Sequence, residues 1–250
     1  MPDLDRATLD NARPAADWLP ARPWNGLTVL DACCGAGGLS MGYYLAGFNV
    51  VGVDHKPMPN YPFEFHQADA LDYVAKHGQD FDLIHASWPC QNKARVTAWR
   101  GNRNDHPDLI TPGKALMKTI GRPWVIENVP EASWDGTLRP DYLLCGSQLG
   151  LNVRRHRVFE TSWGGGGDLL PPCWHHKGLL PFAHKAERAY ADAMGCTWMS
   201  KEEGRQAVPP AYSQWIAEQY LSHHRGPGAL AEYANAHLTP LVADLLGGAR

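Results

Sequence analysis

The stretch at residues 27–47 constrains the fold of this chain more than any other. It opens with an apolar run, LTVLDAC, that has the length and continuity of a buried parallel strand. A turn with Gly35, Gly37 and Gly38 follows, and residues 40–46 then show a helical pattern that ends at a glycine. Glycines let a ligand approach the backbone and a helix N-terminus offers free N–H groups, so this stretch predicts the first half of a nucleotide-type site.

Acidic residues close the next two expected strands. The run NVVGVD ends in Asp54, which follows Gly35 by about 20 residues, the spacing at which an acid grips ribose hydroxyls. Asp69, in QADALDY, stands at another expected strand end and is suited to hold an adenine amino group. The alternative is a plain doubly wound fold whose turn needs glycine for geometry alone.

A second apolar run, FDLIHASWPCQ, predicts a buried strand that stops at Pro89, because proline has no N–H to donate. Cys90 then lies at the carboxyl end of a strand, where α/β sheets carry their chemistry. A cysteine taken alone is more often buried and inert. Trp88 beside it either narrows a pocket or fills the core.

Residues 92–113 show little periodicity and contain several basic side chains. A loop of about 20 residues inside a compact domain is uncommon and usually functional. We expect a mobile lid that meets phosphates; the alternative is a solvated surface loop. Nucleic-acid contacts are expected from Gln91, Lys93, Arg95, Trp99, Arg100 and Arg103.

Two further strands are expected to bring charged groups to the site. PWVIENV ends in Glu127, which would point into the same crevice as Cys90. In NVRRHRVFET an extended backbone places Arg155 and Arg157 on one face, where two guanidiniums suit an anionic or carbonyl-rich ligand. The alternatives are a solvated acid and a charged edge strand.

The last third of the chain is less regular. Residues 163–194 are rich in Pro, His and aromatic residues and predict a small subdomain. Their spacing matches no standard zinc finger, so we expect ordinary surface histidines and no metal. The possible ligands considered are Cys173, His175, His176, His184 and Cys196. Beyond them, Ser200 and Glu203 predict a capping box, and a helix after Pro209 is expected to pack back on the sheet.

Composition sets outer limits. The net charge of −3 excludes a global basic field, so any nucleic-acid contact must be local. No apolar run approaches the roughly 20 residues of a membrane span. The six cysteines form no secreted disulfide framework, and the N-terminus has no signal-peptide pattern. We therefore expect a reducing cytoplasm.

These motifs, in this order, resemble the DNA (cytosine-5-)-methyltransferase family, in particular its compact phage-type members. The resemblance spans residues 27–221 and rests on DACCGAGG, GVDHKP, QADA, PCQ, ENV, RRHR and RQAVPPAY. It implies a Rossmann-like α/β sheet with helices on both faces and a small irregular target-recognition subdomain. Departures from the family pattern are Trp88 before the Pro-Cys pair, Val153 in place of a Gln, and Gln206 in place of an Asn.

The resemblance also implies a setting, a monomer in the cytoplasm of a bacterial or phage-infected cell, and it implies roles. It gives S-adenosylmethionine as the cofactor and double-stranded DNA as the partner, with Cys90 attacking C6 of a flipped-out cytosine whose C5 then takes a methyl group. Glu127 would donate a proton or a hydrogen bond to N3 of the base. Arg157 would hold the O2 carbonyl, and Arg155 would support Arg157. The implied cofactor-binding residues are Asp31, Cys33, Gly35, Gly37, Gly38, Asp54, His55, Asp69, Ala70, Pro89, Gln206, Ala207 and Val208.

The expected organisation has five parts. They are an arm (1–26), a catalytic cofactor-binding domain (27–161), a target-recognition region (162–195), a C-terminal motif that returns to the catalytic domain (196–223) and a tail (224–250). Three alternatives remain open: the same fold acting on RNA, transfer of a modified alkyl group, and a catalytically silent DNA-binding module. An amino-methyltransferase is disfavoured, because SWPCQ stands where an Asn/Asp-Pro-Pro-aromatic turn would be required.

Overall fold

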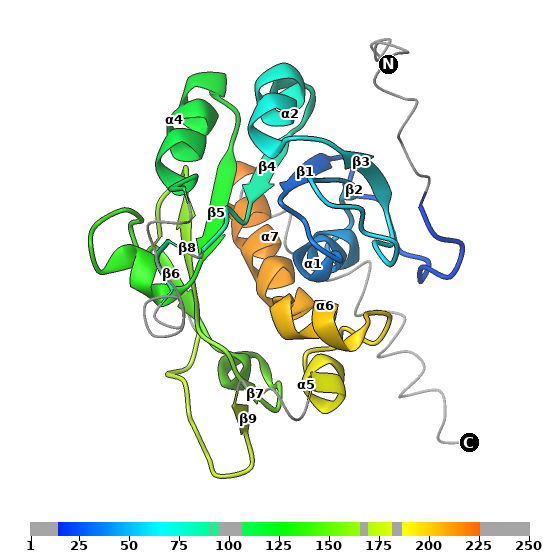
Figure 1. Cartoon of the computed structure of the whole chain (residues 1–250), viewed down its shortest axis with the longest axis vertical. Coiled ribbons are helices and arrows are strands. Elements are labelled where there is room, and N and C mark those ends of the chain that lie inside the picture. The colour runs from blue at the N-terminus through cyan, green and yellow to red at the C-terminus, as the bar shows by residue number, and fades with distance from the viewer. Residues whose placement is uncertain (1–14, 91, 95–106, 166–169, 182–186, 226–250) are drawn as a thin grey trace.

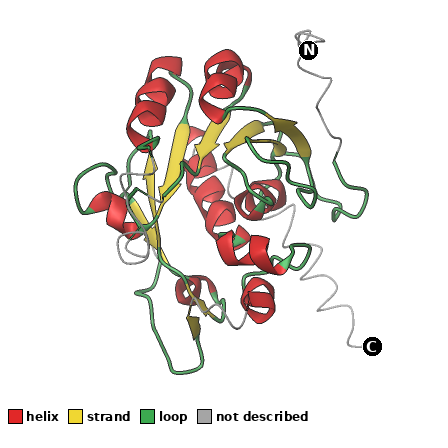
Figure 2. Ribbon diagram, viewed as in Figure 1, coloured by secondary structure: helices red, strands yellow, loops and turns green. Residues whose placement is uncertain are grey.

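The computed structural model describes residues 15–90, 92–94, 107–165, 170–181 and 187–225. This part of the chain forms a mixed α/β fold around a seven-stranded sheet with helices on both faces (Figures 1 and 2). The strands are β1 (Thr28–Ala32), β2 (Asn49–Asp54), β3 (Glu64–Gln67), β4 (Leu83–Ala86), β5 (Trp124–Asn128), β6 (Tyr142–Leu144), β7 (Val153–Arg154), β8 (Arg157–Thr161) and β9 (Leu180–Pro181). The α-helices are α1 (Gly38–Leu45), α2 (Ala70–His77), α4 (Ile110–Ile120), α5 (Glu187–Ala193), α6 (Lys201–Gln206) and α7 (Pro210–Arg225). Short 3-10 helices are η2 (Gly78–Asp80), η4 (Pro130–Ser133) and η5 (Gly146–Leu149).

The strand order of the large sheet is β3-β2-β1-β4-β5-β8-β6. Strands β3, β2, β1, β4 and β5 run parallel, whereas β8 is antiparallel to both of its neighbours. The carboxyl ends of β1, β2, β4 and β5 therefore meet at one edge, which is where open α/β sheets place their ligands. A separate two-stranded sheet pairs β7 with β9.

Alternation along the strands builds two cores. Val29 and Leu83 point to the face covered by α1 and α7, while Leu30 and Ile84 point to the face covered by α2 and α4. Successive residues of a strand face opposite ways, so continuous apolar strands fill both layers. A smaller apolar cluster joins β7 to α5 and the segment before α6.

Some expected boundaries differ in the structure. Helix α1 begins at Gly38, two residues before the expected start, and α4 begins at Ile110 within the expected loop. Residues 163–194 are not wholly irregular, because they contain β9 and α5. Residues 16–25 are not a loose arm: Arg22 donates to the carbonyls of Gly47 and Phe48 and lies over the ring of Tyr44.

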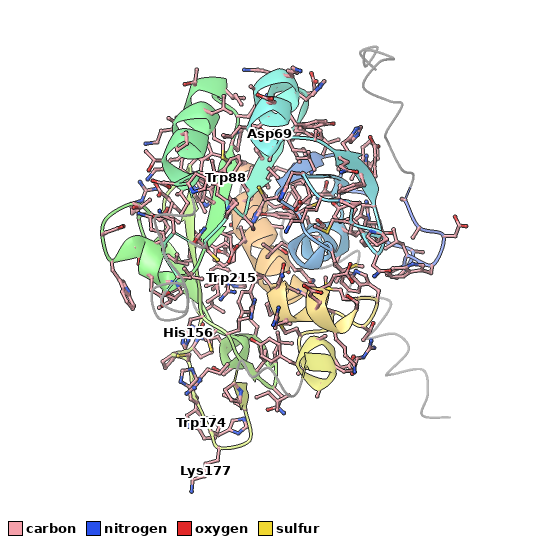
Figure 3. All side chains as sticks on the ribbon, in the orientation of Figure 1. Asp69, Trp88, His156, Trp174, Lys177 and Trp215 are labelled. Atoms are coloured by element: carbon pink, nitrogen blue, oxygen red, sulfur yellow. The ribbon has the colours of Figure 1, made fainter. Side chains whose placement is uncertain are left out.

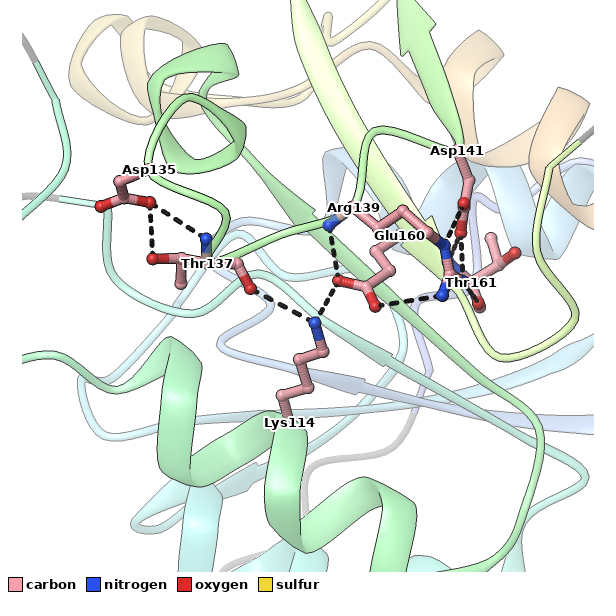
Figure 4. A network of polar contacts seen from close by, with 7 residues as sticks. All are labelled: Lys114, Asp135, Thr137, Arg139, Asp141, Glu160 and Thr161. Atoms are coloured by element: carbon pink, nitrogen blue, oxygen red, sulfur yellow. Dashed lines mark hydrogen bonds and ion pairs between the residues drawn. The ribbon is translucent and has the colours of Figure 1, made fainter.

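A buried carboxylate ties α4 to the sheet (Figure 4). Glu160, on β8, is 2% exposed, and its Oε2 lies 2.6 Å from Nζ of Lys114. The same oxygen accepts a hydrogen bond from the backbone N–H of Arg139, at 2.9 Å. A buried carboxylate without partners would destabilise the fold. These contacts therefore fix α4 and the backbone at Arg139 on the sheet.

Trp88 fills the core beneath the end of β4. It is 1% exposed and belongs to the apolar cluster under α2 and α4. Gly113 of α4 makes room for it, since a Cβ at position 113 would lie 2.3 Å from Cε2 of the indole. The bulky residue that precedes Pro89 and Cys90 thus braces their turn from the side of α4.

This packing predicts the effect of Gly113→Ala. Alanine improves helix propensity by about 1 kcal/mol, whereas overpacking a core costs about 1–3 kcal/mol. The 2.3 Å approach places the cost near the top of that range, so we expect a net loss of about 1–2 kcal/mol in the free energy of unfolding, measured by urea denaturation. Adding Trp88→Phe removes the clash, so the double variant should be more stable than the sum of the stability losses of the two single variants predicts. If the two losses simply add, the packing of Trp88 against Gly113 is contradicted.

In the described ranges, no helix combines the length and apolar character that crossing a membrane would require.

Candidate functional site

The turn between β1 and α1 is held by an unusual backbone. Cys33, Gly35 and Gly37 all have positive φ, at 59°, 51° and 85°. Only glycine adopts this region at little cost, which explains the two glycines and makes Cys33 a strained position. No side chain caps the N-terminus of α1, so the turn presents backbone there.

The C-terminal motif packs directly on this turn. A Cβ at Gly38 would lie 2.3 Å from the carbonyl oxygen of Val208, so the close contact of the two backbones requires glycine. The indole Nε1 of Trp198 donates to the carbonyl of Ala36 at 2.9 Å. Val208, a candidate cofactor residue, therefore lies beside the candidate glycine Gly38, and Gln206 and Ala207 directly precede it in the chain.

Acidic groups gather at the ends of β1 and β2. Burial raises the pKa of Asp31 to about 7; a hydrogen bond from Ser40 opposes the rise, and the charges of Glu127 and Asp54 add to it. Oδ1 of Asp31 is buried and has no hydrogen-bond partner within the described ranges. Asp54 accepts from the backbone N–H of Gly35 at 3.1 Å, which locks the end of β2 to the glycine turn.

The remaining candidates near this edge are less constrained. His55 is exposed, and its Nδ1 lies 3.2 Å from Oδ1 of Asp54. Asp69 serves as the N-cap of α2, where it accepts from the backbone N–H of Asp72 at 3.0 Å, and Ala70 opens the helix as a buried residue. The sequence interpretation gave Asp69 a ligand role and missed the capping role, which its place before a helical run could have signalled.

Cys90 begins a turn just beyond β4. Its carbonyl accepts from the backbone N–H groups of Lys93 and Ala94 at 2.9 and 2.8 Å. Asn128, at the end of β5, donates from Nδ2 to the carbonyl of Trp88 at 2.8 Å and so fixes the approach to half-buried Pro89 and Cys90. Asn128 is a positioning residue that sequence reasoning did not single out, although it stands inside ENV.

The charge balance at Cys90 differs from expectation. Burial raises the pKa of the Cys90 thiol; Arg157 and Arg155 lower it, and Glu127 raises it, with a net rise above the ordinary value. The arginines thus act in the expected direction but do not outweigh burial. Burial therefore favours the protonated form of the thiol.

Glu127 and Arg157 face one another next to this thiol. Nε of Arg157 lies 2.8 Å from Oε1 of Glu127, which is 4% exposed. The pair is an ion pair by distance, yet Oε1 accepts no well-directed hydrogen bond from the described residues. The carboxylate and the guanidinium are therefore in place but not locked together.

Arg155 and Arg157 do not act as twin donors on one face. β7 ends at Arg154 and β8 begins at Arg157, so the expected continuous strand is broken between them. Arg155 is 6% exposed and donates to the hydroxyl of Tyr190 and the carbonyl of Gln206, each at 3.0 Å. Arg155 therefore joins α5 and the end of α6 to the link between β7 and β8, and Arg157 is the guanidinium that faces Glu127.

Only one candidate nucleic-acid contact can be placed. Lys93 pairs with Asp135 at 2.8 Å and with the hydroxyl of Thr137 at 2.9 Å, so its charge is largely satisfied by the protein. The other candidates, Gln91, Arg95, Trp99, Arg100 and Arg103, lie outside the described residues.

No protein-family model matches this chain. No curated protein matches it by sequence. Among solved structures, it is similar to the Dnmt2 methyltransferase of S. pombe, with 21% identity and a TM-score of 0.37, over 54% of this chain and 50% of that chain. It is also similar to a SAM-dependent methyltransferase from Agrobacterium tumefaciens, with 15% identity and a TM-score of 0.24, over 47% and 52% of the two chains. The chain matches about half the length of each, and at such scores neither likeness decides the chemistry.

Proposed function

We propose that this chain is an S-adenosylmethionine-dependent methyltransferase that methylates C5 of cytosine in DNA through a covalent bond from Cys90. One observation carries the proposal: β4 and β5, neighbours in the sheet, bring Cys90 and Glu127 to one edge beside the glycine turn of β1, and β8, next to β5, begins at the same edge with Arg157, which pairs with Glu127. A thiol, an acid and a guanidinium are what addition to a pyrimidine ring requires.

The residues at the turn fit the cofactor. S-adenosylmethionine carries an ammonium group and a sulfonium, and it supplies an electrophilic methyl group when bound. Asp31 offers a buried acceptor without a partner in the described part of the chain, and Glu127 and Asp54 add negative charge around it. A cationic ligand relieves that repulsion. Gly35, Gly37 and Asp54 would hold the cofactor at the turn, with the backbone at Val208 alongside.

Cys90 supplies the nucleophile. C5 of cytosine is itself a poor nucleophile, and addition of the thiolate to C6 makes it an enamine that can take a methyl group. Solvent water then takes the C5 proton, and the electrons of that C–H bond expel the thiolate and restore the aromatic ring. Because burial favours the protonated thiol, its proton must pass to solvent water before attack.

Glu127 and Arg157 stabilise the ring as charge develops on it. A protonated Glu127 donates to N3, and Arg157 donates to O2. Protonation of Glu127 also removes the anion that raises the pKa of the Cys90 thiol, so the field of Arg157 then favours the thiolate. Binding of the base and activation of the nucleophile are thereby coupled.

The substrate must be an unstacked base. A cytosine inside a duplex hides C6 behind its neighbours, so it must be flipped out at a cost of a few kcal/mol. Arg155 acts as a positioning residue, since it holds the segment before Arg157 against α5 and the end of α6.

The test is methyl transfer to matched DNA and RNA. Purified protein is incubated with methyl-labelled S-adenosylmethionine and either cytosine-rich duplex DNA or RNA of the same sequence, and product nucleosides are identified by mass spectrometry. We expect 5-methylcytosine in DNA. If only RNA is labelled, the substrate is RNA and not DNA. If the added mass is not that of a methyl group, the donor is a modified cofactor. Label on N4 of cytosine, or no label at all, would overturn the proposal.

A further inference from the structure

Four metal-ligating side chains meet outside the site described above. Cys145, His156, Cys173 and His175 each offer one ligand atom, and these atoms all lie within 4.8 Å of one another. Sγ of Cys145 is 3.4 Å from Nε2 of His175, and Sγ of Cys173 is 3.5 Å from Nε2 of His156. In Figure 3, His156 lies above the extended loop that carries Trp174 and Lys177.

The distances fit a tetrahedral zinc ion. Zinc binds thiolate sulfur at about 2.3 Å and imidazole nitrogen at about 2.0–2.1 Å, which separates neighbouring S and N ligands by about 3.5–3.6 Å at tetrahedral angles. Both measured S···N distances are within about 0.2 Å of that value. Two thiolates also balance the double charge of the ion.

We propose that Cys145, His156, Cys173 and His175 bind one zinc ion that fixes the recognition region to the catalytic sheet. Four protein ligands complete a tetrahedron and leave no position for water, which is the pattern of structural zinc sites and not of catalytic ones. The proposal stands independently of the proposed methyltransferase activity, because it concerns ligands and not substrate.

The ligands come from three separate segments. Cys145 follows β6, His156 lies in the link between β7 and β8, and Cys173 and His175 lie in the segment before β9. That segment has little regular structure, and Trp174 within it is 72% exposed. A segment that buries so little apolar surface gains stability from a metal cross-link, as small metal-bound units do.

Neighbouring hydrogen bonds support the same site. The hydroxyl of Ser147 donates to Sγ of Cys145 at 3.5 Å and accepts from the backbone N–H of Trp174 at 3.2 Å. Nε2 of Gln148 donates to the carbonyl of Pro171 at 3.0 Å. The segment is thus already aligned with η5, and such outer contacts orient first-sphere ligands.

The site reaches the catalytic edge through His156. This residue stands between Arg155 and Arg157, and its carbonyl accepts from Nη1 of Arg157 at 2.8 Å. A metal bond to the imidazole would hold the backbone from which Arg157 extends toward Glu127. The ion is therefore placed to position the guanidinium without touching the substrate.

The sequence pointed away from this site because its ligands are far apart. Cys173 and His175 were among the possible ligands, but Cys145 and His156 lie well upstream and form no finger spacing with them. Two other candidates serve elsewhere: His176 accepts from the backbone N–H of Gly178, and Cys196 is buried in the small apolar cluster. His184 lies outside the described residues.

Metal content of the intact chain tests the proposal. The protein is purified under reducing conditions, incubated with zinc and dialysed, and bound metal is measured by plasma mass spectrometry. We expect one zinc ion per chain. Exposed His175→Ala and Cys173→Ser should lose stoichiometric zinc, while His176→Ala, next to the site, should retain it. Full zinc retention by the first two variants, or no bound zinc in the native chain, would overturn the proposal.

Cobalt identifies the ligands directly. Co²⁺ in place of zinc should give the absorption of a tetrahedral ion with thiolate-to-metal charge transfer. The charge-transfer intensity should fall by about half in Cys173→Ser, because one of two thiolates is removed, and it should be unchanged in His176→Ala. Peptide mapping of the freshly reduced, metal-treated chain gives a further check. If it finds a disulfide between Cys145 and Cys173, these two thiols form a covalent cross-link and do not bind zinc.

Discussion

Cys90→Ala is expected to abolish methyl transfer to cytosine, with a loss of at least about 10⁴-fold in turnover, as removal of a covalent nucleophile causes in other enzymes. The variant should still bind S-adenosylmethionine, because the glycine turn and the acids of β1 and β2 are untouched. Turnover is measured with methyl-labelled cofactor, and cofactor binding by calorimetry. Loss of turnover with intact binding separates the chemistry from the fold.

Trapping the covalent bond gives the matching control. DNA that contains 5-fluorocytosine retains fluorine where a proton must leave, so the native chain should remain attached to it. Cys90→Ala should form no adduct, while Cys196→Ala, which changes a buried cysteine outside the site, should form it normally. An active Cys90→Ala protein, or an adduct at another residue, would remove Cys90 from the mechanism.

Local chemistry made several elements of the fold predictable. The strand at Asn49–Asp54 has the predicted bounds, and the capping box of Ser200 and Glu203 is present as predicted. Both features can be predicted from residues that are close in the sequence. A continuous apolar run is typical of a strand in a parallel sheet, and a capping box needs only a Glu three residues after the Ser. The same holds for the glycine turn, where Gly35 and Gly37 have the positive φ that only such residues adopt freely.

Long-range contacts decided what the sequence missed. The role of Arg155 depends on Tyr190, 35 residues away, and on Tyr212, whose hydroxyl donates to its carbonyl from 57 residues away. No local period encodes these partners, and the period of two for Arg155 and Arg157 fails because the strand breaks between them. Trp88 is similar: only the approach of Gly113 shows that it fills the core.

The sequence also could not predict the relative sizes of the effects that act on the pKa of Cys90. The basic residues near Cys90 give the correct sign for an arginine field, but burial outweighs it and raises the pKa of the thiol. How deeply a side chain is buried depends on the assembled fold. The sign of a neighbouring charge therefore does not give the net shift of the thiol pKa. Glu127 and burial both raise this pKa, so loss of the Glu127 charge would leave burial as the one main influence that opposes Arg157.

Glu127→Gln is therefore expected to have two opposite effects. Turnover should fall by about 10²–10⁴-fold, because an amide does not transfer a proton to N3. The pKa of the Cys90 thiol should fall, since the negative charge that raises it is gone and Arg157 is then opposed by burial alone. A lower pKa means more thiolate at a given pH, so alkylation of Cys90 by iodoacetamide should become faster while methyl transfer becomes slower.

Mass spectrometry of the Cys90 peptide gives the alkylation rate as a function of pH, free of signal from exposed Cys173. In Glu127→Gln the rise in that rate should shift to lower pH, whereas Glu131→Gln, which changes an acid that is not among the main influences on the thiol, should leave both the profile and turnover unchanged. If Glu127 were only a structural partner of Arg157, its replacement would loosen the site and slow turnover without this acid shift. A profile that stays in place or moves to higher pH would therefore refute the coupling between Glu127 and Cys90, whatever happens to the rate of methyl transfer.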